Sequence, residues 1–144
     1  MGLFLCKGYM AVNFSYGRPE KLKSRKLLDQ LFKEGKTFSI FPVKVFYLQP
    51  DETFHFPIKT GVGVSSRHFK KAVDRNRIKR LLREAYRTEK LPLHEFLNNH
   101  QKEVAIFFLY IDKILPEKKN IKSIMPQIIE RLMKKINETA ASNT

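Results

Sequence analysis

The sequence predicts a single α+β domain in which amphipathic helices pack against a sheet. The chain has 144 residues, of which 42% are hydrophobic, so it can bury one substantial core. Segments rich in β-branched and aromatic residues, which are typical of strands, occur at 37–49, 58–65 and 103–111. Apolar residues at helical spacing precede, separate and follow these segments, and no repeat or linker divides the chain.

The N-terminal part is expected to be an irregular leader followed by a short helix. Residues 1–19 have no clear period, and their apolar start lacks the preceding basic region of a signal peptide, so we predict a disordered or irregular leader. The helix is expected between Ser24, as its N-cap, and Gly35, as the residue after its C-terminus. Its apolar stripe consists of Leu27, Leu28, Leu31 and Phe32.

The first strand segment, 37–49, contains Pro42, which should interrupt it or mark a sheet edge. After Pro42, Val43, Val45 and Tyr47 point to one face of the sheet, and Lys44, Phe46 and Leu48 point to the other. A turn is expected at 49–52.

The second strand, 58–65, carries Gly61 and Gly63 on one face, where another group can approach the backbone closely. The spacing is too short to indicate a phosphate-binding loop, and we favour a packing role.

The second half of the chain predicts a helix, a strand and a final helix. The helix should run from Ala72 to Thr88, ending before Pro92. Segment 103–111 is apolar on both faces, which indicates a strand covered on both sides and a parallel neighbour.

After a loop at 116–120, the final helix should carry apolar residues from Ile121 to Ile136. Ser123 as its N-cap would place Pro126 in the first turn, where the missing N–H is tolerated. Residues 138–144 should form a frayed tail.

Charge, hydropathy and cysteine content together limit the classes of partner and function. The chain carries 28 Lys and Arg against 14 Asp and Glu, a net charge of +14, which predicts a polyanionic partner. No apolar run approaches the ~18 residues of a membrane span, and the strands argue against a membrane-surface helix, so no membrane partner is expected. Cys6 is the only cysteine, which excludes an internal disulfide and agrees with a cytoplasmic protein.

The positive charge is densest at 67–87. On a helix, Ile78, Leu81, Leu82 and Ala85 fall within one arc, and basic residues form a ridge about 16 Å long on the opposite side. Phosphates of a duplex strand advance about 3.4 Å each, so the ridge can contact several. A solvated helix face is the alternative, but like charges this close repel without an anion between them. The candidate binding residues are Arg67, Lys70, Lys71, Arg75, Asn76, Arg77, Lys79, Arg80, Arg83 and Arg87.

The sequence predicts no catalytic or metal-binding residues. The four histidines have no metal-ligand spacing, and no G-x-S-x-G or Walker-type motif is present. Aromatic residues are the stronger signal, because Phe46 beside Lys44 on a sheet face and Phe32 on the first helix would suit a single nucleic-acid strand. Burial in the core remains the alternative for each ring.

The run Ala72-Val73-x-Arg75-Asn76-Arg77-Ile78-Lys79-Arg80-x-x-Arg83-Glu84 resembles the RNR signature of the bacterial ribonuclease P protein subunit. The likeness extends from Leu22 to Gly35, through 61–65, to the apolar strand and the final helix, and covers residues from about 20 to 136. Ser66 replaces a frequent Lys and Leu28 a frequent Phe, and the segment before Ala72 is one residue longer than in some members.

The resemblance implies that residues 20–137 form an αβββαβα domain with a four-stranded mixed sheet, like the second domain of ribosomal protein S5. It also implies that the basic helix joins two parallel strands by a left-handed βαβ crossover. General handedness rules alone would predict a right-handed one.

For function, the resemblance implies the protein component of ribonuclease P, an endoribonuclease whose RNA subunit, with bound Mg²⁺, cleaves precursor tRNA to leave its mature 5′ end. The expected partners are that RNA subunit and precursor tRNA, bound by the basic ridge, with the 5′ leader bound by Phe32, Lys44 and Phe46. One alternative is a non-catalytic RNA-binding protein, such as a ribosomal protein. Another is a DNA-binding helix module, which we do not expect because no short helix precedes the basic one to position it.

Overall fold

The computed structural model describes residues 21–22, 25–49, 58–100 and 102–142. The expected leader at 1–19, the N-cap Ser24 and the turn after Gln49 lie outside these ranges. In chain order the elements are α1 (Arg25–Glu34), β1 (Lys36–Ile40), β2 (Val43–Leu48), β3 (Ile58–Val64), α2 (Ala72–Glu89), α3 (Leu91–Asn99), β4 (Val104–Tyr110) and α4 (Lys118–Ser142).

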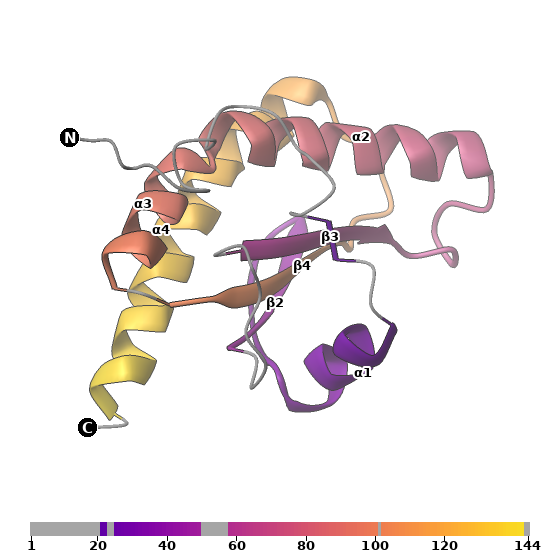
Figure 1. The fold of residues 1–144 in the computed structure, drawn as a ribbon. Coiled ribbons are helices and arrows are strands. Elements are labelled where there is room, and N and C mark those ends of the chain that lie inside the picture. The colour runs from indigo at the N-terminus through magenta and orange to yellow at the C-terminus, as the bar shows by residue number, and fades with distance from the viewer. Residues whose placement is uncertain (1–20, 23–24, 50–57, 101, 143–144) are drawn as a thin grey trace.

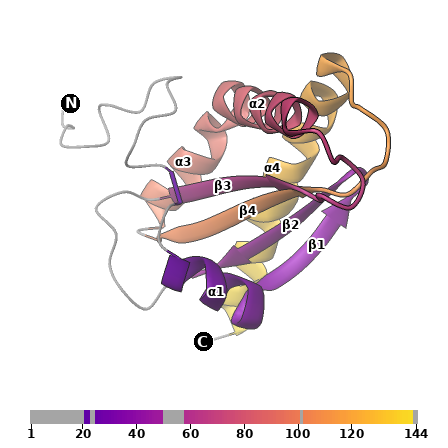
Figure 2. The same cartoon turned by 90° about the vertical axis from the view of Figure 1, so that its right-hand side faces the viewer.

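The strands form one mixed sheet in the order β1-β2-β4-β3. β2 pairs antiparallel with β1 and β4, whereas β3 pairs parallel with β4, which confirms the parallel neighbour expected for this strand. The chain leaves β3, returns through α2 and α3, and enters β4 as a left-handed crossover (Figures 1 and 2). The α+β fold with a four-stranded mixed sheet is therefore confirmed.

The two faces of the sheet are covered unequally. α2, α3 and α4 lie on one face and α1 lies on the other, as Figures 1 and 2 show. On the first face, alternate side chains of β2 and β4 pack with the helices into one core: Val43, Val45, Tyr47, Ile106, Phe108 and Tyr110. The alternation predicted after Pro42 is therefore confirmed, with Lys44, Phe46 and Leu48 half-buried on the second face.

Pro42 interrupts the first strand segment, as predicted. β1 ends at Ile40, the Phe41–Pro42 peptide is cis, and β2 pairs back with Ile40 opposite Val43. Gly35 directly follows α1, which confirms its predicted place after the helix C-terminus, and no described glycine has positive φ. A Cβ atom at Gly35 would lie 2.3 Å from the Leu31 carbonyl oxygen, so close approach is what requires glycine here.

The predicted helix from Ala72 to Thr88 is confirmed by α2, which ends before Pro92 as expected. The sequence prediction missed α3, because Pro92 was interpreted only as the end of the preceding helix. Pro92 instead lies in the first turn of α3, where its absent N–H costs no intrahelical hydrogen bond. Leu93 and Leu97 of this helix are fully buried.

The predicted start of the last helix was wrong. α4 begins at Lys118, so Pro126 lies inside it, and the Ser123 hydroxyl donates to the Asn120 carbonyl at 2.9 Å instead of capping the helix. Burial of Ile121 and Met125 favours the extra turns at this end. The helix continues through Ser142, so the tail expected to fray from residue 138 is helical up to that residue.

Candidate nucleic-acid interface

α2 presents the basic ridge because its apolar stripe is fixed in the core. Ile78, Leu82, Ala85 and Tyr86 are buried, and Leu81 is half-buried, close to the predicted arc. On the opposite side of the helix, the side chains of Asn76, Arg80 and Arg83 are exposed and that of Lys79 is half-buried. Arg77 is exposed on a flank of the helix. The ridge therefore exists as a surface feature of a rigid helix.

Arg75, at the start of the ridge, is engaged within the protein. Its Nη1 donates hydrogen bonds to the carbonyl oxygens of Phe69 and Lys70, at 2.9 and 2.8 Å. These bonds fix the loop before α2, where Arg67, Lys70 and Lys71 are exposed. The side chain thus positions neighbouring cations, a role that the sequence did not reveal.

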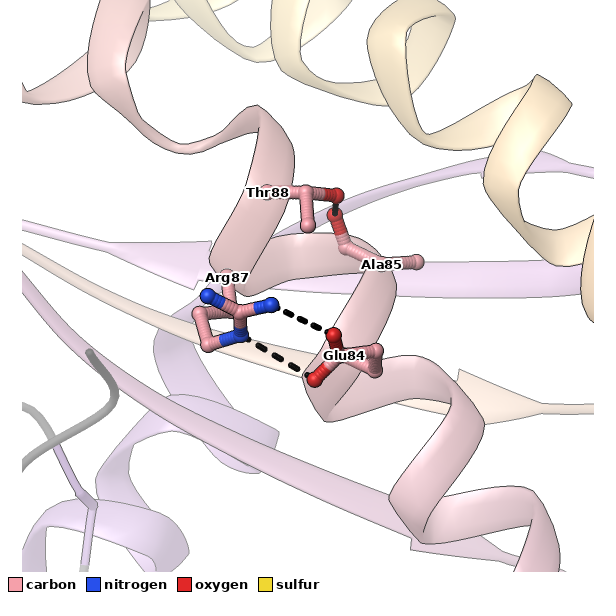
Figure 3. Close-up of polar contacts among 4 residues, drawn as sticks. All are labelled: Glu84, Ala85, Arg87 and Thr88. Atoms are coloured by element: carbon pink, nitrogen blue, oxygen red, sulfur yellow. Dashed lines mark hydrogen bonds and ion pairs between the residues drawn. The ribbon is translucent and has the colours of Figure 1, made fainter. Parts of the chain in front are cut away.

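Arg87, at the other end, is held by Glu84 on the same helix. Its Nε donates to Glu84 Oε2 at 3.0 Å and its Nη2 to Oε1 at 2.5 Å (Figure 3). The Arg87 guanidinium lowers the pKa of Glu84, so this carboxyl stays ionised and offsets part of the positive charge. In contrast, Arg77, Lys79, Arg80 and Arg83 have no hydrogen bond or ion pair with any residue that the structure describes. These four cations form the part of the ridge with uncompensated charge.

A groove leads from the ridge to the second face of the sheet. It has a volume of about 350 Å³, and its walls include Arg83 of α2, Gly61 of β3, Phe107 of β4 and Leu28 of α1. Leu22, whose backbone N–H donates to the Thr60 carbonyl, closes one side. A cationic side chain and an aromatic ring therefore line the same depression.

Next to this groove, an aromatic cluster spans α1 and the sheet. Phe32 is 48% exposed and meets the rings of Phe46 and Phe107 edge to face, each with a centroid distance of 5.1 Å. Lys44 Nζ lies 5.2 Å from the centroid of the Phe46 ring. The structure thus brings together Phe32, Lys44 and Phe46 as the sequence analysis expected, with Phe46 half-buried outside the main core.

Phe107 is the member of this cluster that the sequence analysis missed. Segment 103–111 is apolar throughout, so nothing in it marked one ring as accessible. The sequence signal for this ring was the pair of glycines in β3. A Cβ atom at Gly61 would lie 3.0 Å from the Phe107 ring, and one at Gly63 would lie 2.6 Å from it. The glycines accommodate the ring, which confirms their packing role.

Metal-ligating side chains do not cluster in the part of the chain that the structure describes. Among them, no group of at least three His, Cys, Asp and Glu side chains could hold a metal ion. His94 is fully buried 3.3 Å from the Tyr86 hydroxyl, and burial lowers its pKa to about 4, aided by Lys90. In the same part of the chain, no helix combines the length and apolarity needed to cross a bilayer.

Comparison with protein families finds the ribonuclease P family, whose model matches residues 16–136. The ribonuclease P protein component of Porphyromonas gingivalis is 32% identical over 130 residues, which are 90% of this chain and 95% of that protein. That of Chlorobium phaeobacteroides is 33% identical over 128 residues, 85% of this chain and 88% of the relative.

Solved structures show the same fold at lower sequence identity. The ribonuclease P protein of Staphylococcus aureus superposes with a TM-score of 0.60 at 20% identity, over 78% of this chain and 94% of that one. The ribonuclease P protein of Thermotoga maritima gives a TM-score of 0.58 at 21% identity, over 78% of this chain and 96% of the other.

Proposed function

This chain belongs to the ribonuclease P protein family, and from that premise we propose that it is the protein subunit of ribonuclease P in the cytoplasm. In this role it binds the RNA subunit and precursor tRNA and assists removal of the 5′ leader. One observation carries the proposal: the uncompensated cations of α2 continue, through Arg83, into a groove next to partly exposed aromatic rings.

The two parts of this surface suit two kinds of RNA. A row of cations on a rigid helix matches regularly spaced phosphates, so we assign Arg77, Lys79, Arg80 and Arg83, with Asn76, to the folded RNA subunit. Partly exposed rings beside a cation suit an unpaired strand, whose bases stack while its phosphates pair with the cation. We therefore assign Phe32, Phe46 and Phe107, with Lys44, to the leader.

Arg75 and Arg87 have different roles in this proposal. Arg75 arranges the loop that presents Arg67, Lys70 and Lys71 to RNA. Arg87 contributes less to phosphate binding than Arg80 or Arg83, because Glu84 already occupies two of its donors.

Catalysis belongs to the RNA subunit in this proposal, with Mg²⁺ bound by RNA and not by a protein site. The cations of the protein screen phosphates that Mg²⁺ must otherwise screen, so the protein lowers the Mg²⁺ concentration needed for cleavage. No side chain of the protein takes part in the chemical step.

The test is cleavage of 5′-labelled precursor tRNA by a bacterial ribonuclease P RNA at limiting Mg²⁺, with and without the purified protein. We expect strong stimulation, no cleavage by protein alone, and cleavage by RNA alone when Mg²⁺ is high. An Arg80→Ala/Arg83→Ala variant should stimulate less, while Lys134→Ala, an exposed cation on α4, serves as the matched control. Cleavage by protein alone, or absence of stimulation, contradicts the proposal.

A further inference from the structure

One end of the molecule exposes large apolar side chains that neither the ridge nor the aromatic cluster uses. Phe41, in the turn between β1 and β2, is 68% exposed. Ile114 and Leu115, in the loop between β4 and α4, are 71% and 41% exposed. Isolated exposed apolar residues are ordinary, but several on adjoining loops indicate an interaction surface.

These loops adjoin one another at the carboxyl ends of β3 and β4. The Ile111 N–H donates to the Pro42 carbonyl at 2.9 Å, which ties the β1–β2 turn to the end of β4. The Tyr110 hydroxyl donates to the Ile114 carbonyl at 2.7 Å. On the other side, the Tyr110 ring lies 6.1 Å from that of Phe69, in the loop before α2. Figure 2 shows the three connections converging at one end of the sheet.

Tyr110 therefore contacts both the loop before α4 and the loop before α2, and stabilises this end of the molecule from the core side. It is almost fully buried, and burial raises the pKa of its phenol to about 12, aided by Asp112, so the hydroxyl remains a donor at every physiological pH. Apolar side chains on loops fixed in this way are displayed in constant positions, which reduces the entropy lost when a partner binds.

The same end is strongly cationic. Arg67, Lys70 and Lys71 of the loop before α2 and Lys113 of the loop before α4 are exposed. Asp112 lies beside Lys113, where its carboxylate accepts the Lys113 backbone N–H at 2.7 Å. We call Phe41, Ile114, Leu115 and these four cations the loop-end surface. Docking two copies through it would bring like charges together, which opposes self-association.

We propose that the loop-end surface binds an unpaired nucleotide of the catalytic RNA, with the base on Phe41 and the flanking phosphates at the cations. The inference rests on the proposed function, because the loop that carries Lys70 and Lys71 runs directly into the ridge of α2. One RNA lying along the ridge therefore reaches this end, where an aromatic ring and cations form a site that single strands prefer.

The test compares Phe41→Ser with Phe41→Tyr, which keeps a ring for stacking. Affinity for the ribonuclease P RNA alone should fall by about 5- to 150-fold in Phe41→Ser and change little in Phe41→Tyr. Ile114→Ser should weaken binding to a lesser degree. Chemical probing of the RNA should show an unpaired nucleotide that wild-type protein protects and Phe41→Ser exposes.

Melting temperatures of the variants separate this effect from unfolding, since Phe41 is mostly exposed and its loss should leave them unchanged. Unchanged RNA affinity in both Phe41→Ser and Ile114→Ser, with weakened binding in Arg80→Ala, overturns this inference and leaves the proposed function standing. Unchanged affinity in all three variants contradicts both. Binding of wild-type protein to anionic vesicles or to itself that Phe41→Ser abolishes, with RNA affinity retained, assigns the surface to a membrane or a second copy and also overturns the inference.

Discussion

Phe107 and Phe108 are neighbours on β4, yet they lie on opposite faces of the sheet and in different environments. Phe108 is fully buried under α2, with its ring 5.7 Å from that of Tyr86. Phe107 is half-buried beside Phe32, which is itself 48% exposed. One face of the sheet is closed by three helices, and the other is only partly covered by α1.

This difference separates what stabilises the fold from what is available for binding. Phe108 and Tyr110 on the closed face bury nearly their whole surface, so their contribution goes to folding. Rings on the open face stay partly in water although more complete burial would stabilise the protein. Natural proteins retain such surfaces where a ligand completes the burial, which is the role proposed here for the leader.

The largest expected effect is on the closed face. Phe108→Ala should lower the free energy of unfolding by about 3–5 kcal/mol, because it leaves a cavity between β4 and α2. Denaturant unfolding measures this loss. At temperatures where the variant is folded, affinity for precursor tRNA and mature tRNA should change by the same factor. A loss confined to precursor tRNA would contradict the assignment of the two faces.

Next in size is a pH effect of His94, which lies in the same closed layer. The unfolded histidine takes up a proton as the pH falls through 6.5, whereas the buried one resists until about 4. The unfolded state therefore binds more protons in this window, so stability is full above it and falls with decreasing pH, by at most ~3 kcal/mol.

Thermal melts from pH 7 to pH 4 test this effect. His94→Gln should show a shallower decline than wild type, because glutamine takes up no proton. Parallel declines in the two proteins would mean that carboxyl groups elsewhere, and not His94, cause the loss of stability in acid.

A smaller effect is expected on the open face. Phe46→Leu and Phe107→Leu should each weaken binding of precursor tRNA with a leader of several nucleotides by about 1–3 kcal/mol and leave mature tRNA unaffected. Their stability should fall by less than about 1.5 kcal/mol, since leucine retains most of the apolar volume. Affinities measured with the assembled holoenzyme test this. Equal losses of affinity for both tRNAs, with a lowered melting temperature, would mean that these rings serve the core and do not bind the leader.

The smallest effect should come from single ridge cations at the border between the faces. Arg83→Ala should reduce the salt slope of log K for the RNA subunit by about 0.7–0.9, the value for one lost phosphate contact. Arg87→Ala should change the slope less, because Glu84 already pairs with Arg87. A salt series on both variants provides the comparison, and an unchanged slope and affinity for Arg83→Ala would remove this residue from the interface.

Local patterns in the sequence were sufficient for much of this architecture. The period of β2 separated Lys44 and Phe46 from Val43 and Val45, and the period of α2 separated its ridge from its buried stripe. Both patterns arise from backbone geometry within a few residues, so no distant segment is needed to interpret them. The basic composition indicated a polyanionic partner for the same reason, since net charge does not depend on the fold.

The tertiary structure decided what each side chain meets. Arg75 and Arg80 are both arginines in one basic run and cannot be told apart from the sequence. Only Arg75 donates hydrogen bonds to carbonyl groups in the loop before α2. Phe107 became part of the candidate site because Gly61 and Gly63 of another strand leave room for its ring. Pro126 indicated a helix start locally, yet it lies inside α4, where burial of Ile121 and Met125 favours the extra turns. These outcomes depend on contacts between segments far apart in the chain, and a local pattern carries no information about such contacts.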